Sequence, residues 1–168
     1  ADGIISAIVM LKQMGFEKIG IMGVSFGGIC ALIAARESKE IQYLVLKSPI
    51  SDYKSIEEKR KNISQWEKEG KVEVVTKAGK KYTMKWDFIV DAEKNNAHGF
   101  GKEIQIPVFI VHGDEDVIVP VQQSEKLNLV LPNSTLEIIK GADHFYHKSE
   151  DFEKAIHLMV DFVLGLLE

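Results

Sequence analysis

The sequence has little cysteine and no long apolar run. Cys30 is the single cysteine in 168 residues, so no internal disulfide can form and a reducing, cytoplasmic location is expected. No stretch reaches the roughly 18 apolar residues that a membrane-spanning helix needs, and no signal peptide is recognisable, so no membrane partner is expected. The chain begins at Ala1 rather than at methionine, which favours a piece of a longer protein.

The chain also lacks a strong net charge. It carries −4 in total, although the segment 53–86 holds ten Lys or Arg against five Glu. Acidic and basic residues are interspersed there, and no nucleic-acid-binding motif accompanies them. We interpret this segment as a solvated helix and hairpin and expect no nucleic-acid partner. Attraction of an anionic substrate is the alternative.

Short apolar runs alternate with helical patterns along most of the chain. The runs 18–24, 41–47, 108–111 and 135–139 predict strands, and the spacing of apolar residues predicts helices over 2–14, 28–36, 121–131 and 152–167. Alternation of this kind is typical of an α/β fold, in which a mostly parallel sheet carries helices on both faces. The crossover rule places these four strands side by side in one sheet.

Residues 51–104 interrupt this alternation. They predict a charged helix over 53–69, a hairpin around Lys77-Ala78-Gly79-Lys80 and a helix over 87–95. We therefore expect a core formed by residues 1–50 and 105–168, with residues 51–104 as a small helix-hairpin cap inserted between two core strands.

One strand-to-helix junction carries an isolated serine between glycines, Gly23-Val24-Ser25-Phe26-Gly27-Gly28. In this nucleophile-elbow pattern a strained backbone exposes the serine hydroxyl at the carboxyl end of the sheet, and we expect Gly23 and Gly27 to prevent side-chain collisions around it. The following helix aims backbone N–H groups at the same spot. The alternative is a glycine-rich tight turn with no catalytic role. We interpret Ser25 as a nucleophile.

A serine nucleophile needs a base and a group that orients the base. His144 follows the strand predicted at 135–139, in a loop at the same sheet edge as Ser25, and is the predicted base. Asp114, Glu115 and Asp116 follow the strand at 108–111 and compete for the orienting role.

The other four histidines have less suitable positions. His112 ends a strand, which favours a structural role. His157 lies in the last predicted helix and His147 just ahead of it, whereas His98 has no strand before it.

Three motifs together resemble the α/β-hydrolase superfamily. The elbow at Ser25 is the first. The stretch 112–120, "HGDEDVIVP", is similar to the family motif HGxxDxxVP, and "GADHF" resembles the stretch around the family's catalytic histidine. The order Ser, Asp, His is the one that this fold imposes. Among its members, the chain looks like small carboxylesterases, acyl hydrolases and the prolyl-oligopeptidase-like group.

The resemblance assigns a role to each residue. It implies that Asp116 is the triad acid, that His144 is the general base for Ser25, and that the backbone N–H of Phe26 donates to the oxyanion. The reaction expected is hydrolysis of esters of small or medium acyl groups through an acyl-enzyme, with an ester as substrate and with no cofactor or metal. The alternatives are a prolyl-oligopeptidase-like peptidase and a non-catalytic assembly module.

Part of the family pattern is missing. A second oxyanion donor usually comes from a His-Gly-Gly or His-Gly-Phe loop before the nucleophile, but only 24 residues precede Ser25. His98-Gly99-Phe100 has this spelling but lies after the nucleophile, so we interpret it as a linker; a displaced oxyanion loop is the alternative. The nucleophile strand is then expected at an exposed sheet edge, covered by a missing N-terminal segment or by a second copy in a homodimer.

Overall fold

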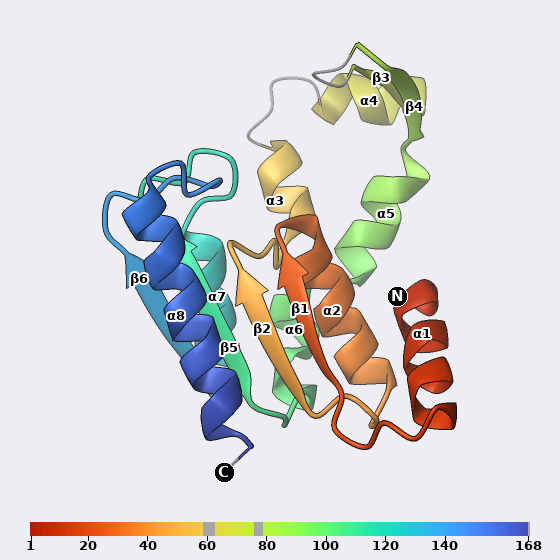
Figure 1. The fold of residues 1–168 in the computed structure, drawn as a ribbon. Helices are drawn as coiled ribbons and strands as arrows, with labels where there is room; N and C mark the ends of the chain where they lie inside the picture. The colour runs from red at the N-terminus through yellow and green to blue at the C-terminus, as the bar shows by residue number, and fades with distance from the viewer. Residues whose placement is uncertain (59–62, 76–78, 168) are drawn as a thin grey trace. The chain divides into compact units, whose positions relative to one another are not determined.

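The computed structural model describes residues 1–58, 63–75 and 79–167, and the chain forms two compact units (Figure 1). Ala1–Ser51 and Ala97–Glu168 form the first unit, and Asp52–Asn96 form the second. The insertion expected from the sequence spans 51–104 and is longer than the second unit. Helix α6 (Ala97–Phe100) and the following 3₁₀ turn, Gly101–Glu103, pack within the first unit against α7 (Gln122–Val130).

A four-stranded parallel sheet forms the centre of the first unit (Figure 1). Its order is β1-β2-β5-β6, and the strands span Gly20–Val24, Tyr43–Lys47, Val108–Gly113 and Ser134–Ile139. All three pairings are parallel, with Val24 opposite Lys47 and Lys47 opposite Val111. The four strands correspond to the four predicted runs, and their carboxyl ends share one edge. The α/β fold with a mostly parallel sheet is thereby confirmed.

Helices cover both faces of this sheet (Figure 1). On one face α1 (Asp2–Gln13), α2 (Phe26–Glu37) and α7 contribute to the larger apolar core, together with Leu44 and Leu46 of β2. On the other face α8 (Ser149–Gly165) packs Ala155 and Met159 against the alternate β2 residues. Strand β2 therefore contacts apolar side chains on both faces, as expected for a parallel sheet with two helical layers.

The second unit combines helices with a two-stranded ribbon. Helices α3 (Tyr53–Glu58) and α4 (Ile63–Glu69) lie within the predicted 53–69 helix, whose residues 59–62 lie outside the described part of the chain. Strands β3 (Lys71–Val75) and β4 (Lys81–Lys85) pair antiparallel, and α5 (Asp87–Lys94) follows. The predicted hairpin is present, but Lys77 and Ala78 of its turn lie outside the described residues.

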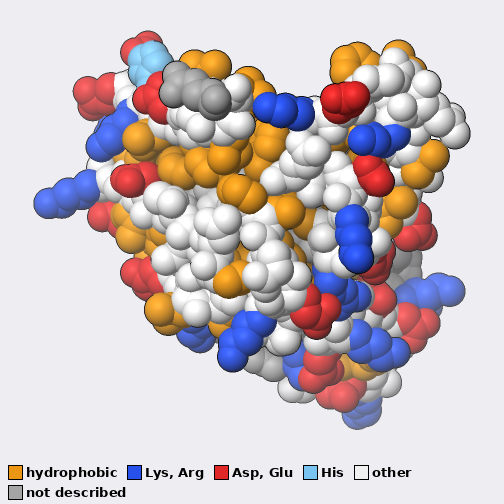
Figure 2. All heavy atoms as spheres, turned by 90° about the horizontal axis from the view of Figure 1, so that it is seen from below, with side chains coloured by type: hydrophobic (Ala, Val, Ile, Leu, Met, Phe, Trp, Pro, Cys, Tyr) orange, Lys and Arg blue, Asp and Glu red, His pale blue; other side chains and the backbone are white. Residues whose placement is uncertain are grey.

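Strand β1 pairs on one side with β2 and has no strand beside its other edge among the described residues. A shallow apolar groove of about 360 Å³ runs between β1 and α8. Met22, Val160 and Leu164 line it and are each about half exposed. Figure 2 shows hydrophobic side chains gathered as a band on the face of the molecule seen from below. No helix of the described residues is long and apolar enough to cross a membrane.

Candidate active site

Ser25 lies at the junction between β1 and α2. Its backbone has φ 52° and ψ −119°. Residues other than glycine rarely adopt this conformation, which costs about 1–3 kcal/mol. Three backbone hydrogen bonds hold it: the Ser25 N–H donates to the Lys47 carbonyl at 3.0 Å, and the Ser25 carbonyl accepts from Gly28 and Ile50, each at 2.9 Å. Ser25 is therefore a residue with a strained backbone, held by hydrogen bonds, directly after the carboxyl end of β1.

The glycines around Ser25 have different roles. A Cβ at Gly23 would lie 2.8 Å from the Gly27 carbonyl oxygen, and one at Gly28 would lie 2.5 Å from Cβ of Pro49. Apart from its chain neighbours and the backbone of its own helix, no described atom lies within 4 Å of a Cβ built at Gly27, so the collision expected there is not found. The close approach of β1, α2 and the segment after β2 therefore requires Gly23 and Gly28, and the expectation for Gly27 is wrong.

Phe26 is the first residue of α2, directly after Ser25. The first N–H groups of a helix point out of its N-terminus without intrahelical acceptors, and the helix dipole favours negative charge there. The Phe26 side chain is 44% exposed, so aromatic packing in the core does not explain its position. Its backbone N–H lies at the N-terminal end of α2, next to Ser25, which is the position where the sequence predicts an oxyanion donor.

Asp116 and His144 are joined directly. The Nδ1–H of His144 donates to Asp116 Oδ2 at 2.6 Å, and both residues are buried. A carboxylate only accepts, so this bond places the imidazole proton on Nδ1 and leaves Nε2 to accept a proton. The other oxygen, Asp116 Oδ1, accepts the N–H groups of Ile118 and Val119 at 2.9 and 2.8 Å.

The pKa of Asp116 lies well below its usual range. Burial alone would raise it, but hydrogen bonds from the His112 and His144 rings and from the Val119 N–H outweigh burial. Asp116 is therefore a carboxylate at neutral pH and can both orient His144 and stabilise its charged form.

The neighbouring acids have no comparable contact. Asp114 is exposed, and its Oδ1 accepts the Gly141 N–H at 2.6 Å, which fastens the turn after β6. Glu115 is exposed, and its N–H donates to the Ala142 carbonyl. Of the three acids weighed from the sequence, the structure brings Asp116 alone to His144.

His112 contributes a contact that the sequence did not indicate. It is fully buried, and its Nε2–H is shared between Asp116 Oδ2 at 3.1 Å and the Val119 carbonyl at 2.9 Å. Its Nδ1 lies 2.6 Å from the Ser124 hydroxyl. His112 thus has the structural position expected for it and also holds the acid of the pair. Its placement four residues before Asp116 is the signal that could have suggested this.

The remaining histidines lie elsewhere. The His147 ring bonds to Asp143 at the surface, and His157 is exposed on α8. His98 lies in α6, and its Nε2 is 2.9 Å from the hydroxyl of Ser51, which is fully buried. His98-Gly99-Phe100 is therefore part of a short helix that packs in the first unit.

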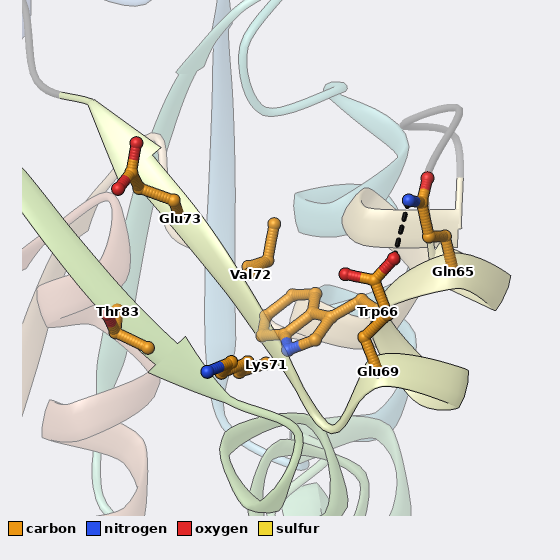
Figure 3. Close-up of a pocket in the computed structure, with 7 residues that line it drawn as sticks. All are labelled: Gln65, Trp66, Glu69, Lys71, Val72, Glu73 and Thr83. Carbon is orange, nitrogen blue, oxygen red and sulfur yellow. Dashed lines mark hydrogen bonds between the residues drawn. The ribbon is translucent and has the colours of Figure 1, made fainter.

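The second unit has a hollow of its own, of about 370 Å³ (Figure 3). Trp66 stands in its wall, and Gln65 donates to Glu69 at 2.7 Å beside it. None of the residues that line it is a histidine or a serine, so we do not assign acyl-transfer chemistry to it. No group of three or more His, Cys, Asp or Glu in the described parts of the chain is arranged to hold a metal ion.

Comparison with known proteins identifies several similar chains. The profile of the prolyl oligopeptidase family matches residues 3–168. The human serine hydrolase BPHL is 26% identical over 164 residues, an alignment that covers 88% of this chain and 56% of BPHL. The chain thus spans little more than half the length of this curated relative.

Two solved structures show the same fold. Est1E from Butyrivibrio proteoclasticus superposes with a TM-score of 0.79 at 24% identity, covering 98% of this chain and 69% of Est1E. The mouse α/β hydrolase domain-containing protein 10 superposes with a TM-score of 0.74 at 21% identity, covering 96% of this chain and 68% of that one. These structures support the α/β-hydrolase fold that the motifs around Ser25, Asp116 and His144 suggested.

Proposed function

The chain belongs to the prolyl oligopeptidase family, and on this premise we propose that it is a serine hydrolase that cleaves carboxylic esters of small or medium acyl groups. The observation that carries the proposal is the 2.6 Å bond from His144 Nδ1–H to Asp116, at the sheet edge where Ser25 forms a strained tip. This pair supplies an oriented base, and parallel strands bring the loop that carries it to the same sheet edge as Ser25. An oriented base and a serine hydroxyl are what acyl transfer requires.

In the proposed reaction Ser25 Oγ attacks the ester carbonyl carbon while His144 Nε2 takes its proton. The tetrahedral oxyanion accepts a hydrogen bond from the Phe26 N–H. It then collapses to an acyl-enzyme as the protonated His144 passes its proton to the leaving alkoxide. His144 then takes a proton from water as the water oxygen attacks the acyl carbon; the bond to Ser25 Oγ breaks, His144 returns the proton to Oγ, and the carboxylic acid leaves. Asp116 keeps the imidazole in the required tautomer throughout. No step needs a metal or cofactor.

A second oxyanion donor and a cover for the open edge of β1 belong to the same proposal. Among the described residues before Ser25 only α1 and β1 are formed, and loss of one oxyanion donor costs about 10²–10³ in rate. We propose that a preceding segment of the protein pairs with β1, fills the groove at Met22 and Val160, and supplies this donor. A homodimer of this chain is the alternative. Sedimentation equilibrium separates them, because a dimer would have twice the 18.9 kDa mass, whereas the proposal expects a monomer.

A peptidase is the second candidate function, because the matching family is named for prolyl oligopeptidase. We expect hydrolysis of p-nitrophenyl acetate and butyrate to exceed that of a proline-containing peptide p-nitroanilide. Ester leaving groups depart more readily than amides and need no gating of a peptide chain. Because this reactivity difference holds for either function, the deciding measurement is anilide cleavage itself. Turnover of the anilide that depends on Ser25 would favour the peptidase, whereas ester turnover without any anilide cleavage would favour the esterase.

The remaining alternative is that the chain is a non-catalytic assembly module, and covalent labelling of Ser25 tests it. A fluorophosphonate should form a covalent adduct with the folded chain, and peptide mass spectrometry should locate it on Ser25. No adduct in a folded sample would contradict the proposed function of this chain.

A further inference from the structure

Lys47, the last residue of β2, is a buried lysine with 8% of its surface exposed. Alternation along the strand places it on the same sheet face as Tyr43 and Val45, which pack in the core beneath α8. Burial disfavours the charged ammonium and lowers the pKa of Lys47. An apolar residue would avoid this cost, so the lysine needs another explanation.

The ammonium of Lys47 contacts the segment that carries the proposed base. Its Nζ donates to the backbone carbonyl of His144 at 2.9 Å and lies 3.9 Å from the ring centroid of Tyr146. Asp116 and Asp143 face it at longer range and raise its pKa. No carboxylate of the described residues lies within 4.0 Å of this Nζ, so the carbonyl and the aromatic face are its nearest partners.

The backbone of Lys47 contacts the proposed nucleophile. Its carbonyl accepts the Ser25 N–H at 3.0 Å. One residue therefore binds the main chain of Ser25 through its carbonyl and the main chain of His144 through its side chain, although these two residues come from opposite ends of the chain.

The loops that Lys47 joins are also the strained ones. Among the described residues other than glycine, positive φ occurs at Ser25, Ser48 and Tyr146, with values of 52°, 44° and 56°. Each lies at the carboxyl edge of the sheet, after β1, β2 or β6. Such conformations persist where the surroundings over-determine them, and they cluster at functional sites. The contacts of Lys47 with Ser25 and Tyr146 help to hold these two residues in their strained backbone conformations.

We propose that Lys47 is a positioning residue of the acyl-transfer site: its ammonium holds the His144–Tyr146 segment against the strand that supports Ser25. The inference rests on the proposed function. Asp116 fixes the rotation of the His144 ring, whereas Lys47 fixes where the main chain of His144 lies. Both are needed for Nε2 to meet the serine hydroxyl, because a misplacement of about 1 Å can cost on the order of 10² in rate.

The test compares Lys47→Met, which keeps the bulk but removes the ammonium, with Lys148→Met. Lys148 is an exposed lysine near His144 that donates to the Gly141 carbonyl at 3.3 Å, so it is a matched control. Lys47→Met should slow fluorophosphonate labelling of Ser25 on the order of 10²-fold and lower kcat for p-nitrophenyl butyrate while KM stays unchanged. Lys148→Met should label like the unmodified protein.

Two further readouts separate positioning from folding. The downfield ¹H resonance of the proton between His144 Nδ1 and Asp116 should weaken or vanish in Lys47→Met, although both partners remain. Lys47→Arg, which keeps a cation able to reach a carbonyl, should recover part of the labelling rate even if Lys47→Met folds poorly.

Each failure has a distinct meaning. If the unmodified protein is not labelled, the proposed function fails. If it is labelled and Lys47→Met is labelled equally fast, the positioning role of Lys47 is wrong. A Lys47→Arg rate no faster than that of Lys47→Met would also contradict it.

Discussion

Replacing Ser25 with alanine is expected to abolish ester turnover and phosphonate labelling. The substitution removes the atom that would form the acyl-enzyme, and no neighbouring hydroxyl inherits the position at the end of β1. Loss of a serine nucleophile costs on the order of 10⁶ in kcat, which places the variant at the background rate. The measurement is the initial rate with p-nitrophenyl butyrate at saturating ester, together with mass spectrometry of the labelled protein.

Ser48→Ala is the matched control for this substitution. Ser48 also follows a core strand and also has a positive φ, of 44°, but it is fully buried. Both substitutions place an alanine at a position with positive φ, so any cost of backbone strain should be similar. The Ser48 variant should nevertheless retain turnover. Activity that survives Ser25→Ala would move the nucleophile elsewhere in the chain.

Asp116→Asn is expected to lower kcat on the order of 10⁴, whereas Asp114→Asn should have little effect. An asparagine at 116 offers an amide N–H₂ or a weaker oxygen to a ring nitrogen, so it no longer holds the His144 proton on Nδ1. At 114 an asparagine oxygen can still accept the Gly141 N–H, as the Asp114 carboxylate does. The measurement is kcat for each variant on the same ester, and the reverse ranking would show that the acid was assigned wrongly.

Acid stability gives an independent readout of the same carboxyl. The native pKa of Asp116 is lowered relative to about 3.9 in an unfolded chain. The ionised form therefore favours the folded state, and this contribution is full above the unfolded value and is lost as pH falls. Asp116→Asn lacks it, so its free energy of unfolding should change less than that of the unmodified protein as the pH falls from 4 to 2. Urea titrations at both pH values measure the difference.

The sequence by itself determined the features that follow from local backbone chemistry. Glycines around Ser25, after an apolar run and before a helical one, indicate a strand-to-helix turn. The structure confirms the close approach expected at Gly23 and adds one at Gly28. Apolar runs of strand length between helices indicate a parallel sheet, and parallel strands bring the loops after β1, β5 and β6 to one edge. The placement of Ser25 and His144 at that edge was predictable for this reason.

Other features depended on contacts between distant residues. The sequence left Asp114, Glu115 and Asp116 as competitors until a family motif ranked them, because three successive acids in one loop have no local difference. Folding separates them: the backbone N–H groups of Ile118 and Val119 turn Asp116 inward, while Asp114 is turned to Gly141.

Lys47 is the clearest case of a role that only the tertiary structure decided. In the sequence it reads as a charged residue that ends an apolar strand, a position from which a lysine usually reaches solvent. Its actual partner is a carbonyl 97 positions along the chain. The loop before α8 places the His144 carbonyl and the Tyr146 ring against the ammonium. The local sequence pattern determines the backbone conformation and which residues tend to be exposed. Which buried polar groups contact one another depends on how the helical layers pack on the sheet, and the whole fold determines that packing.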